Sequence, residues 1–329
     1  MEIGITTTIP VEVVYAANHT PVDLNNVFIT SPDPQSLIRR AEHDGYPSSV
    51  CAWIKGIYAA AIERGIKAVI AAVEGDCSQT QAMMETLEMH GLEIIPFAFP
   101  HDRSRAALRA QIEKLAERLG TNWSEVQRWK ARLDAIRRNV HKLDEMTWRD
   151  GKITGAENHI WQVSTSDFNG NPDRFEHELI EFLREAELRT PRTHPIRIGI
   201  AGIPPIFTDL HDFIESKGAA VVLNEIQRQF TMPFDTDDIV EQYALYTYPY
   251  DIFGRIEDLK REIKRRNIHG LIHYTQSFCF RQIQDIILRK HIDIPIITIE
   301  GESPGALDAR TRIRVESFLE MMDSSLRKR

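Results

Sequence analysis

An internal repeat constrains the fold of this chain more than any other feature of its sequence. Residues 66–77 and 268–279 each hold an apolar run, then a short loop that ends in a cysteine. The distance from Ile66 to Cys77 is 11 residues, and so is the distance from Ile268 to Cys279. A helical pattern and a second apolar run follow each cysteine. Two segments that share this order favour a duplicated structural unit.

The same shift of 202 positions, from 77 to 279, relates further residues upstream of the two cysteines. The related pairs are Tyr46-Pro47 and Tyr248-Pro249, Arg64 and Arg266, and Cys51 and Phe253. Any two units of this type align in places by chance, but matches over about 30 residues favour duplication. The last pair also shows an asymmetry, since the first half holds two cysteines and the second half holds one.

Apolar runs alternate with amphipathic patterns along most of the chain. Such runs are typical of buried parallel strands, and the patterns between them are typical of helices. The expected strands are residues 2–7, 27–30, 67–73, 92–99, 196–202, 221–224, 270–274 and 294–299. The expected helices include residues 35–43, 79–89, 105–119, 124–143, 174–187, 256–266, 279–290 and 308–322, and one that Ser48-Ser49 caps and that carries Cys51.

This alternation predicts the α/β class, with two similar parallel-sheet domains of the flavodoxin or Rossmann type. We expect a first α/β domain at residues 1–102, which holds Cys51 and Cys77, and a helical segment at residues 103–190. A second α/β domain at residues 191–329 holds Cys279.

Composition excludes several classes of protein. The formal net charge of the 329 residues is −8, which makes a nucleic-acid backbone an unsuitable partner. The sequence contains neither an apolar run long enough to span a membrane nor a signal-peptide pattern. Three cysteines without disulfide spacing are typical of a reducing compartment, so we expect a cytoplasmic protein. The sequence has no phosphate-binding loop and no dinucleotide-binding glycine motif.

The cysteines are the candidate site. Cys77 and Cys279 each follow a predicted strand, and ligands of open α/β sheets bind at the carboxyl ends of strands. All three cysteines lie near the start of a helix, which favours the thiolate that binds metal. Three thiolates suit a zinc ion with one further ligand, or a [4Fe–4S] cluster with one iron left open. Inert buried cysteines are the third interpretation.

The segments around the cysteines resemble a known family. Pro47-Ser-Ser-Val-Cys51-Ala-Trp-Ile-Lys, Gly75-Asp-Cys77-Ser and Ser277-Phe-Cys279-Phe-Arg are similar to the cysteine motifs of the 2-hydroxyacyl-CoA dehydratase and benzoyl-CoA reductase family. The N-terminal Ile9-Pro10-Val-Glu12 and the C-terminal Thr311-Arg312-Ile-Arg-Val-Glu316 resemble the same family. The resemblance covers most of the chain.

The resemblance implies a [4Fe–4S] subunit in which Cys51, Cys77 and Cys279 are the cluster ligands. It also implies one-electron reductive chemistry of anaerobic metabolism, with electrons from a separate ATP-dependent iron–sulfur activator. In the dehydratases this chemistry forms a ketyl radical from a 2-hydroxyacyl-CoA and expels the hydroxyl group. The expected assembly is a homodimer, or a heterodimer with a paralogous subunit, that acts as a lyase or a reductase on a small molecule such as an acyl-CoA.

Two alternatives remain open at this point. The chain is also interpretable as a non-catalytic electron-transfer or partner subunit of an atypical family member that acts on a non-CoA substrate. A zinc-containing or cluster-free binding protein is the other alternative.

His19 is the candidate catalytic residue, as a proton donor near an open iron. Its more ordinary interpretation is a solvated or capping loop residue. Lys55 and Arg281 follow cysteines closely and are candidates to stabilise an anionic cluster, whereas His273 is a candidate lining residue or simply part of a packed strand.

Overall fold

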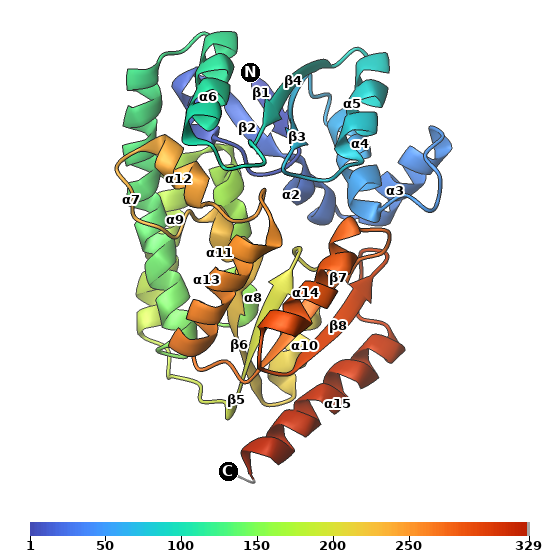
Figure 1. Ribbon diagram of the computed structural model, residues 1–329, viewed down its shortest axis with the longest axis vertical. Coiled ribbons are helices and arrows are strands. Elements are labelled where there is room, and N and C mark those ends of the chain that lie inside the picture. Colours follow the sequence, from blue (N-terminus) through green and yellow to red (C-terminus); the bar gives the residue numbers. More distant parts are fainter. Residues whose placement is uncertain (328–329) are drawn as a thin grey trace. The chain divides into compact units, whose positions relative to one another are not determined.

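A computed structural model describes residues 1–327 (Figure 1). The described chain forms two compact units, each with one four-stranded parallel sheet. Unit 1 comprises Met1–Asn139, Val163–Glu178 and Gln229–Asp251. Unit 2 comprises Val140–Gln162, Leu179–Arg228 and Ile252–Arg329.

The sheet of unit 1 has the strand order β2-β1-β3-β4, and every pair is parallel. Its strands are β1 (Glu2–Ile5), β2 (Thr20–Asp23), β3 (Ala68–Glu74) and β4 (Glu93–Ala98). The central strands are apolar and buried, because helices cover both faces of a parallel sheet. β3 confirms the strand predicted from the apolar run at residues 67–73.

Helices of unit 1 connect its strands and flank its sheet. They are α1 (Val11–Ala16), α2 (Leu24–Ile29), α3 (Pro34–His43), α4 (Ala52–Glu63), α5 (Thr80–Met89), α6 (Arg105–Leu119) and α12 (Ile239–Leu245), with the short 3₁₀ turns η1 (Ser164–Ser166) and η2 (Phe168–Gly170). Within residues 1–327, four helices contribute residues to both units, namely α7 (Trp123–Trp148), α8 (Gly155–Val163), α9 (Pro172–Glu187) and α11 (Glu225–Phe230).

The strand predicted at residues 27–30 is wrong. Residues 27–29 lie in α2 and Thr30 is its C-cap, and the strand of this region is β2, which precedes the helix. Asp23 caps α2 by accepting a hydrogen bond from the Asn25 backbone N–H at 2.9 Å, which starts the helix. β2 is an edge strand and contains Pro21, a residue that edge strands tolerate because one of their sides is unpaired.

The sheet of unit 2 repeats this arrangement with the order β6-β5-β7-β8, again all parallel. Its strands are β5 (Ile196–Gly202), β6 (Ala219–Asn224), β7 (Gly270–Gln276) and β8 (Ile296–Gly301). Besides most of α8, its helices are α10 (Leu210–Ser216), α13 (Ile252–Arg265), α14 (Gln284–His291) and α15 (Ala309–Leu326), with the 3₁₀ turn η3 (Phe280–Ile283).

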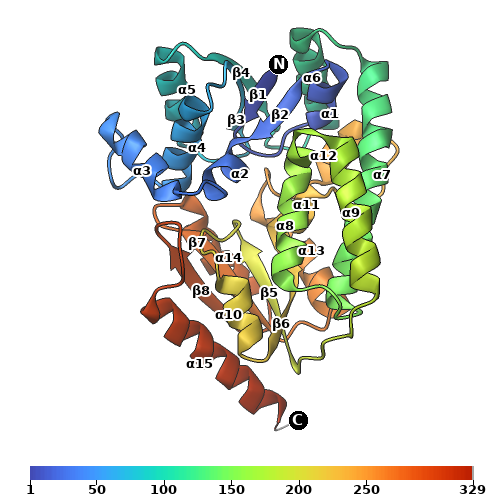
Figure 2. The same cartoon turned by 180° about the vertical axis from the view of Figure 1, so that it is seen from behind.

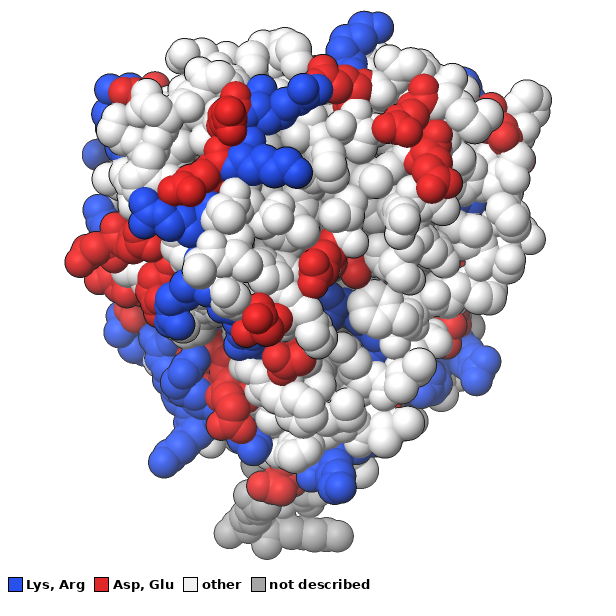
Figure 3. All heavy atoms as spheres, turned by 45° about the horizontal axis from the view of Figure 1, so that its top comes forward, with Lys and Arg blue, Asp and Glu red and all other residues white. Residues whose placement is uncertain are grey.

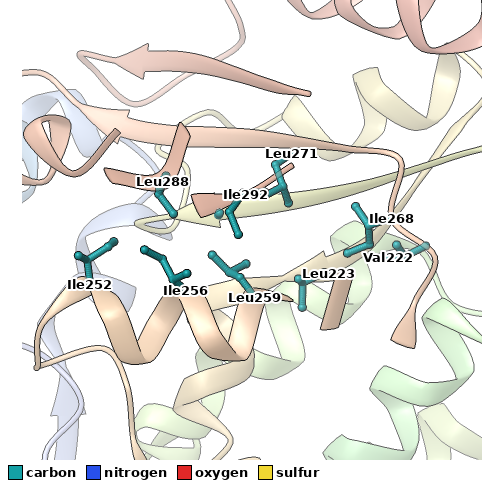
Figure 4. Close-up of a cluster of buried hydrophobic side chains, with 10 residues drawn as sticks. Val222, Leu223, Ile252, Ile256, Leu259, Ile268, Leu271, Leu288 and Ile292 are labelled. Carbon is teal, nitrogen blue, oxygen red and sulfur yellow. The ribbon is translucent and has the colours of Figure 1, made fainter. Parts of the chain in front are cut away.

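Both faces of the unit 2 sheet are covered by helices. Figure 1 shows α13 and α14 on one face, and Figure 2 shows α10 on the other. Ile252, Ile256 and Leu259 of α13 pack against Leu271 of β7 and Leu288 of α14 in a buried cluster (Figure 4). The burial of these apolar side chains fixes α13 on the sheet, since each contributes about 1.5–3 kcal/mol.

The repeat read from the sequence is therefore present in the fold. β3 and β7 have the same length and differ by 202 positions, and they occupy the same place in sheets of the same strand order. Gly65 and Asn267 also correspond, and both adopt left-handed backbone angles where α4 and α13 end. The predicted fold class, α/β with two similar parallel-sheet domains, is confirmed.

Acidic and basic side chains are interspersed on one face of the protein. On the face drawn in Figure 3, they lie beside one another and form no broad area of a single sign among the described residues. Every helix within residues 1–327 is too short or too polar to cross a membrane.

Candidate functional site

Cys51 lies at the carboxyl edge of the unit 1 sheet. It is the N-cap residue of α4, a helix that runs back from that edge to the start of β3. The Pro47–Val50 turn before it is closed by a hydrogen bond from the Val50 N–H to the Pro47 carbonyl oxygen. Cys51 is buried, with 7% of its surface exposed. The turn thus places this thiol beside the start of a helix.

Cys77 lies at the same edge, in the loop between β3 and α5. Its carbonyl oxygen accepts a hydrogen bond from the Thr80 N–H at 3.0 Å, and its sulfur accepts one from the Gln79 N–H at 3.4 Å. A backbone N–H that points at sulfur favours the thiolate over the thiol. Gly75 makes the sharp turn after β3, with a φ of +94°.

Cys279 lies in the corresponding loop of unit 2, between β7 and η3. Its carbonyl oxygen accepts a hydrogen bond from the Gln282 N–H at 3.1 Å, which repeats the turn found at Cys77. Phe278 before it has a φ of +64°, an unfavourable angle for a bulky residue. Strain of this kind is concentrated at functional sites, where the surrounding structure maintains it.

The structure brings two of the predicted ligands to one sheet edge. Cys51 and Cys77 share the carboxyl edge in unit 1, and Cys279 lies at the carboxyl edge of the sheet in unit 2. All three are free of disulfide bonds. Within residues 1–327, the structure holds no group of three or more His, Cys, Asp or Glu side chains arranged for a metal ion.

His19 lies at the opposite edge of the unit 1 sheet from the cysteines. It immediately precedes β2, and its Nδ1 is 3.3 Å from the N-terminal amino group. Partial burial, followed by the nearby positive amino group, lowers the pKa of His19 from its usual value. A catalytic role for His19 stays a prediction.

The charged and polar residues near the cysteines have protein partners. The Lys55 ammonium group is buried and donates to Glu42 at 2.7 Å and to the Ser48 carbonyl oxygen at 3.1 Å. Arg281 is buried, with its guanidinium 5.2 Å from the centre of the Phe280 ring. His273 hydrogen-bonds Asp285 through Nδ1 at 2.8 Å, and burial lowers the pKa of His273. These contacts support the loops that carry the cysteines.

A hollow in unit 1 was not foreseen from the sequence. Its volume is about 710 Å³, and it lies along the edge strand β2 and the η2 turn. Asp23 and Asp167 form one wall, and the Asp23 N–H donates to Asp167 Oδ2 at 2.7 Å. Phe168 and Asn169, next to this pair, both have left-handed φ angles of 51°. The two carboxyl groups are 144 positions apart, so no local pattern indicates that they meet.

Burial and the charge of Asp23 together raise the pKa of Asp167 to about 7. Since this folded-state pKa lies above the unfolded value, its contribution to stability is complete below about pH 4 and is lost as the pH rises to 7, at up to about 1.4 kcal/mol per pH unit. We expect Asp167→Asn to remove this loss, so that its unfolding free energy at pH 8, relative to that at pH 5, is higher than in the wild type. Urea unfolding at both pH values measures it, with the exposed Asp33→Asn as control. An unchanged difference would contradict this role of Asp167.

Comparison with known proteins identifies the family. A family model described as 2-hydroxyglutaryl-CoA dehydratase, D-component, matches residues 6–322. No curated protein sequence matches the chain significantly. The match includes strands β2 to β8 and all three cysteine loops. The chain therefore belongs to the 2-hydroxyglutaryl-CoA dehydratase D-component family.

Proposed function

We propose that this chain is the iron–sulfur subunit of a 2-hydroxyacyl-CoA dehydratase-type enzyme, with Cys51, Cys77 and Cys279 as the ligands of one [4Fe–4S] cluster. The observation that carries the proposal is the matched placement of Cys77 and Cys279. Each follows the corresponding strand of its sheet and accepts the same backbone hydrogen bond from the residue three positions on. Membership of the dehydratase family supports the same assignment.

The donor set fits such a cluster. Iron–sulfur clusters are held by cysteine thiolates, and all three cysteines are free of disulfide bonds. When bound by three thiolates, a [4Fe–4S] cluster supplies one-electron reduction and leaves one iron open to a ligand that is not a cysteine.

The contribution of the protein is to hold the sulfur atoms and keep them deprotonated. The Gln79 N–H stabilises negative charge on the Cys77 sulfur, and Cys51 stands at the positive end of α4. The proposal also includes a separate ATP-dependent iron–sulfur protein as electron donor, a second family subunit as partner and a 2-hydroxyacyl-CoA as substrate. This combination makes the enzyme a lyase.

Anaerobic purification tests the ligand assignment. We expect about four iron and four sulfide ions per chain and a broad visible absorbance. Serine substitutions Cys51→Ser, Cys77→Ser and Cys279→Ser should each lose most of the iron. Ser78→Ala, beside Cys77, is the matched control and should retain it. A colourless protein that binds one zinc ion, or full iron content in Cys279→Ser, would overturn the assignment.

Contact between the substrate and the cluster is tested on the wild-type protein with its cluster bound. A change in the EPR spectrum of the reduced cluster when a 2-hydroxyacyl-CoA is added supports a dehydratase. An unchanged spectrum, with the iron intact, rejects substrate contact in this subunit and assigns it electron transfer alone.

A further inference from the structure

A segment far from Cys77 in the sequence packs onto the loop that carries it. Residues Gln229–Asp251 follow β6 along the chain, yet they belong to unit 1. Within that segment, Pro249 lies against Gly75. A Cβ atom at Gly75 would be 2.7 Å from the Pro249 carbonyl oxygen and 2.9 Å from Phe99 Cβ, closer than real Cβ contacts. Only glycine fits here, both for this space and for its φ of +94°.

The neighbouring residue makes a polar contact with the same loop. The Tyr248 hydroxyl donates to Asp76 Oδ1 at 3.4 Å, and Asp76 directly precedes Cys77. Tyr248 is itself held by aromatic packing, with its ring centre 6.2 Å from that of Tyr246 and 5.8 Å from that of Phe230. This packing holds the Tyr248 ring in place and so fixes the position of its hydroxyl group.

The other side of the loop is fixed by the chain that follows β4. The Phe99 N–H donates to the Glu74 carbonyl oxygen at 3.1 Å, and the His101 N–H donates to the Glu74 carboxylate at 2.9 Å. Phe99 also packs against Tyr246 and Tyr250 of the distant segment. The half-buried Gly75–Asp76 turn is thus contacted by two parts of the chain, which restrict its movement.

The internal repeat supplies a comparison. Tyr46-Pro47 corresponds to Tyr248-Pro249 under the shift of 202 positions. The Tyr46 hydroxyl lies 2.5 Å from Thr86 Oγ1 on α5, and its ring packs on Tyr58 of α4. Tyr46 therefore joins two neighbouring helices, whereas Tyr248 contacts a cysteine loop. The two copies of the motif have different partners.

We infer that Tyr248 and Pro249 are positioning residues for Cys77: they clamp the Gly75–Asp76 turn and so fix the direction of the Cys77 thiolate. This inference rests on the proposed role of Cys77 as a cluster ligand. Some residues do not bind the metal themselves but hold its ligands in position. Removal of such a residue typically lowers metal affinity by about 10–100-fold. Tyr248→Phe removes the hydrogen bond alone, and Gly75→Ala forces the turn away from Pro249.

The experiment makes separate measurements on the cluster-free chain and on the chain with its cluster bound. In the cluster-free chain, iodoacetamide labels Cys77 at a rate followed by peptide mass spectrometry. We expect faster labelling in Tyr248→Phe and Gly75→Ala than in the wild type. In the loaded chain, we expect about tenfold faster loss of iron to a chelator and an altered EPR spectrum of the reduced cluster. Tyr46→Phe, the repeat counterpart, is the matched control and should behave as the wild type in every readout.

The outcomes separate this inference from the proposed function. The inference would be overturned if Tyr248→Phe and a folded Gly75→Ala protein both matched the wild type. The match would have to hold for the labelling rate, the rate of iron loss and the EPR spectrum. If Gly75→Ala fails to fold, Tyr248→Phe alone decides. A wild-type chain that binds no cluster would refute the proposed function, and the labelling rates would still test whether Tyr248 restrains the Cys77 loop.

Discussion

Replacing Arg266 with methionine is expected to lower the free energy of unfolding by about 3–5 kcal/mol. Arg266 is fully buried in unit 2, where its guanidinium donates to both oxygens of Asp144, at 2.9 and 2.5 Å, and to Glu262 at 2.7 Å. It also donates to the Val222 carbonyl oxygen at 2.7 Å. Methionine fills similar space but leaves the two buried carboxylates without this cation.

The ionisation of the partners supports the size of this effect. Burial by itself raises the pKa of Asp144, but the charge and hydrogen bonds of Arg266 outweigh it and hold that pKa below its usual value. Burial also raises the pKa of Glu262, but the charges of Arg228 and Arg266 and the Arg266 hydrogen bond outweigh it and hold that pKa below its usual value. Without Arg266, the buried Asp144 must either take up a proton or remain charged at high cost.

The repeat provides the control for this prediction. Arg64, the counterpart of Arg266, pairs with Glu2, and the two side chains are 43% and 45% exposed. An exposed pair contributes about 0–1 kcal/mol because water and salt screen it. Arg64→Met should therefore cost less than about 1 kcal/mol. Denaturant unfolding of both variants at pH 7 measures the difference, and equal losses would contradict the interpretation of the Arg266 cluster.

Acidification from pH 7 to pH 5 is expected to destabilise the protein steeply, with the His159 and His211 pair in unit 2 as a principal cause. The two rings stack with their centres 4.9 Å apart. His159 Nδ1 lies 2.9 Å from Gln227 Nε2, and His211 Nε2 lies 2.8 Å from Asn224 Oδ1. The amide nitrogen of Gln227 can only donate, so this contact requires a neutral His159 ring.

The direction of this pH effect follows from the pKa values of the two histidines. Burial, followed by the neighbouring His211, lowers the pKa of His159 well below its usual value, and burial lowers the pKa of His211. Because both folded-state pKa values lie below the unfolded value near 6.5, the unfolded chain binds protons first as the pH falls. Stability that is complete above about pH 6.5 is then lost at up to about 1.4 kcal/mol per pH unit for each histidine.

Unfolding by urea between pH 5 and pH 7.5 tests this dependence. His159→Gln should reduce the slope of unfolding free energy against pH, although it lowers stability at pH 7.5. His43, whose side chain is 89% exposed, is the control, and His43→Gln should leave the slope unchanged. A slope in His159→Gln equal to that of the wild type would refute the assignment.

Local patterns were sufficient to predict most elements of the fold. The helix expected at residues 105–119 is α6, and those expected at 35–43 and 174–187 are α3 and α9 within two residues at each end. Apolar runs identified β3 and β7 because both strands are buried on two faces. The strand β2 was missed because it is short, lies at a sheet edge and contains a proline.

The candidate site likewise has features that the sequence predicted and features that it did not. The loop positions of the three cysteines follow from the order of strands and helices, and the family resemblance on those loops was confirmed. The contacts that surround the loops were not predictable. Tyr248 and Asp76 are 172 positions apart, and nothing in residues 229–251 indicates that they pack in unit 1.

The sequence by itself determined the strands, the helices, the duplication and the loops on which the cysteines lie, because apolar periodicity and turn residues act within a few positions. Tertiary structure decided which distant groups meet. Arg266 with Asp144, Asp23 with Asp167, His159 with His211 and Tyr248 with Asp76 come together only when helices and sheets pack. The physical reason is that burial gives these charges and hydrogen bonds their strength, and burial is a property of the packed chain.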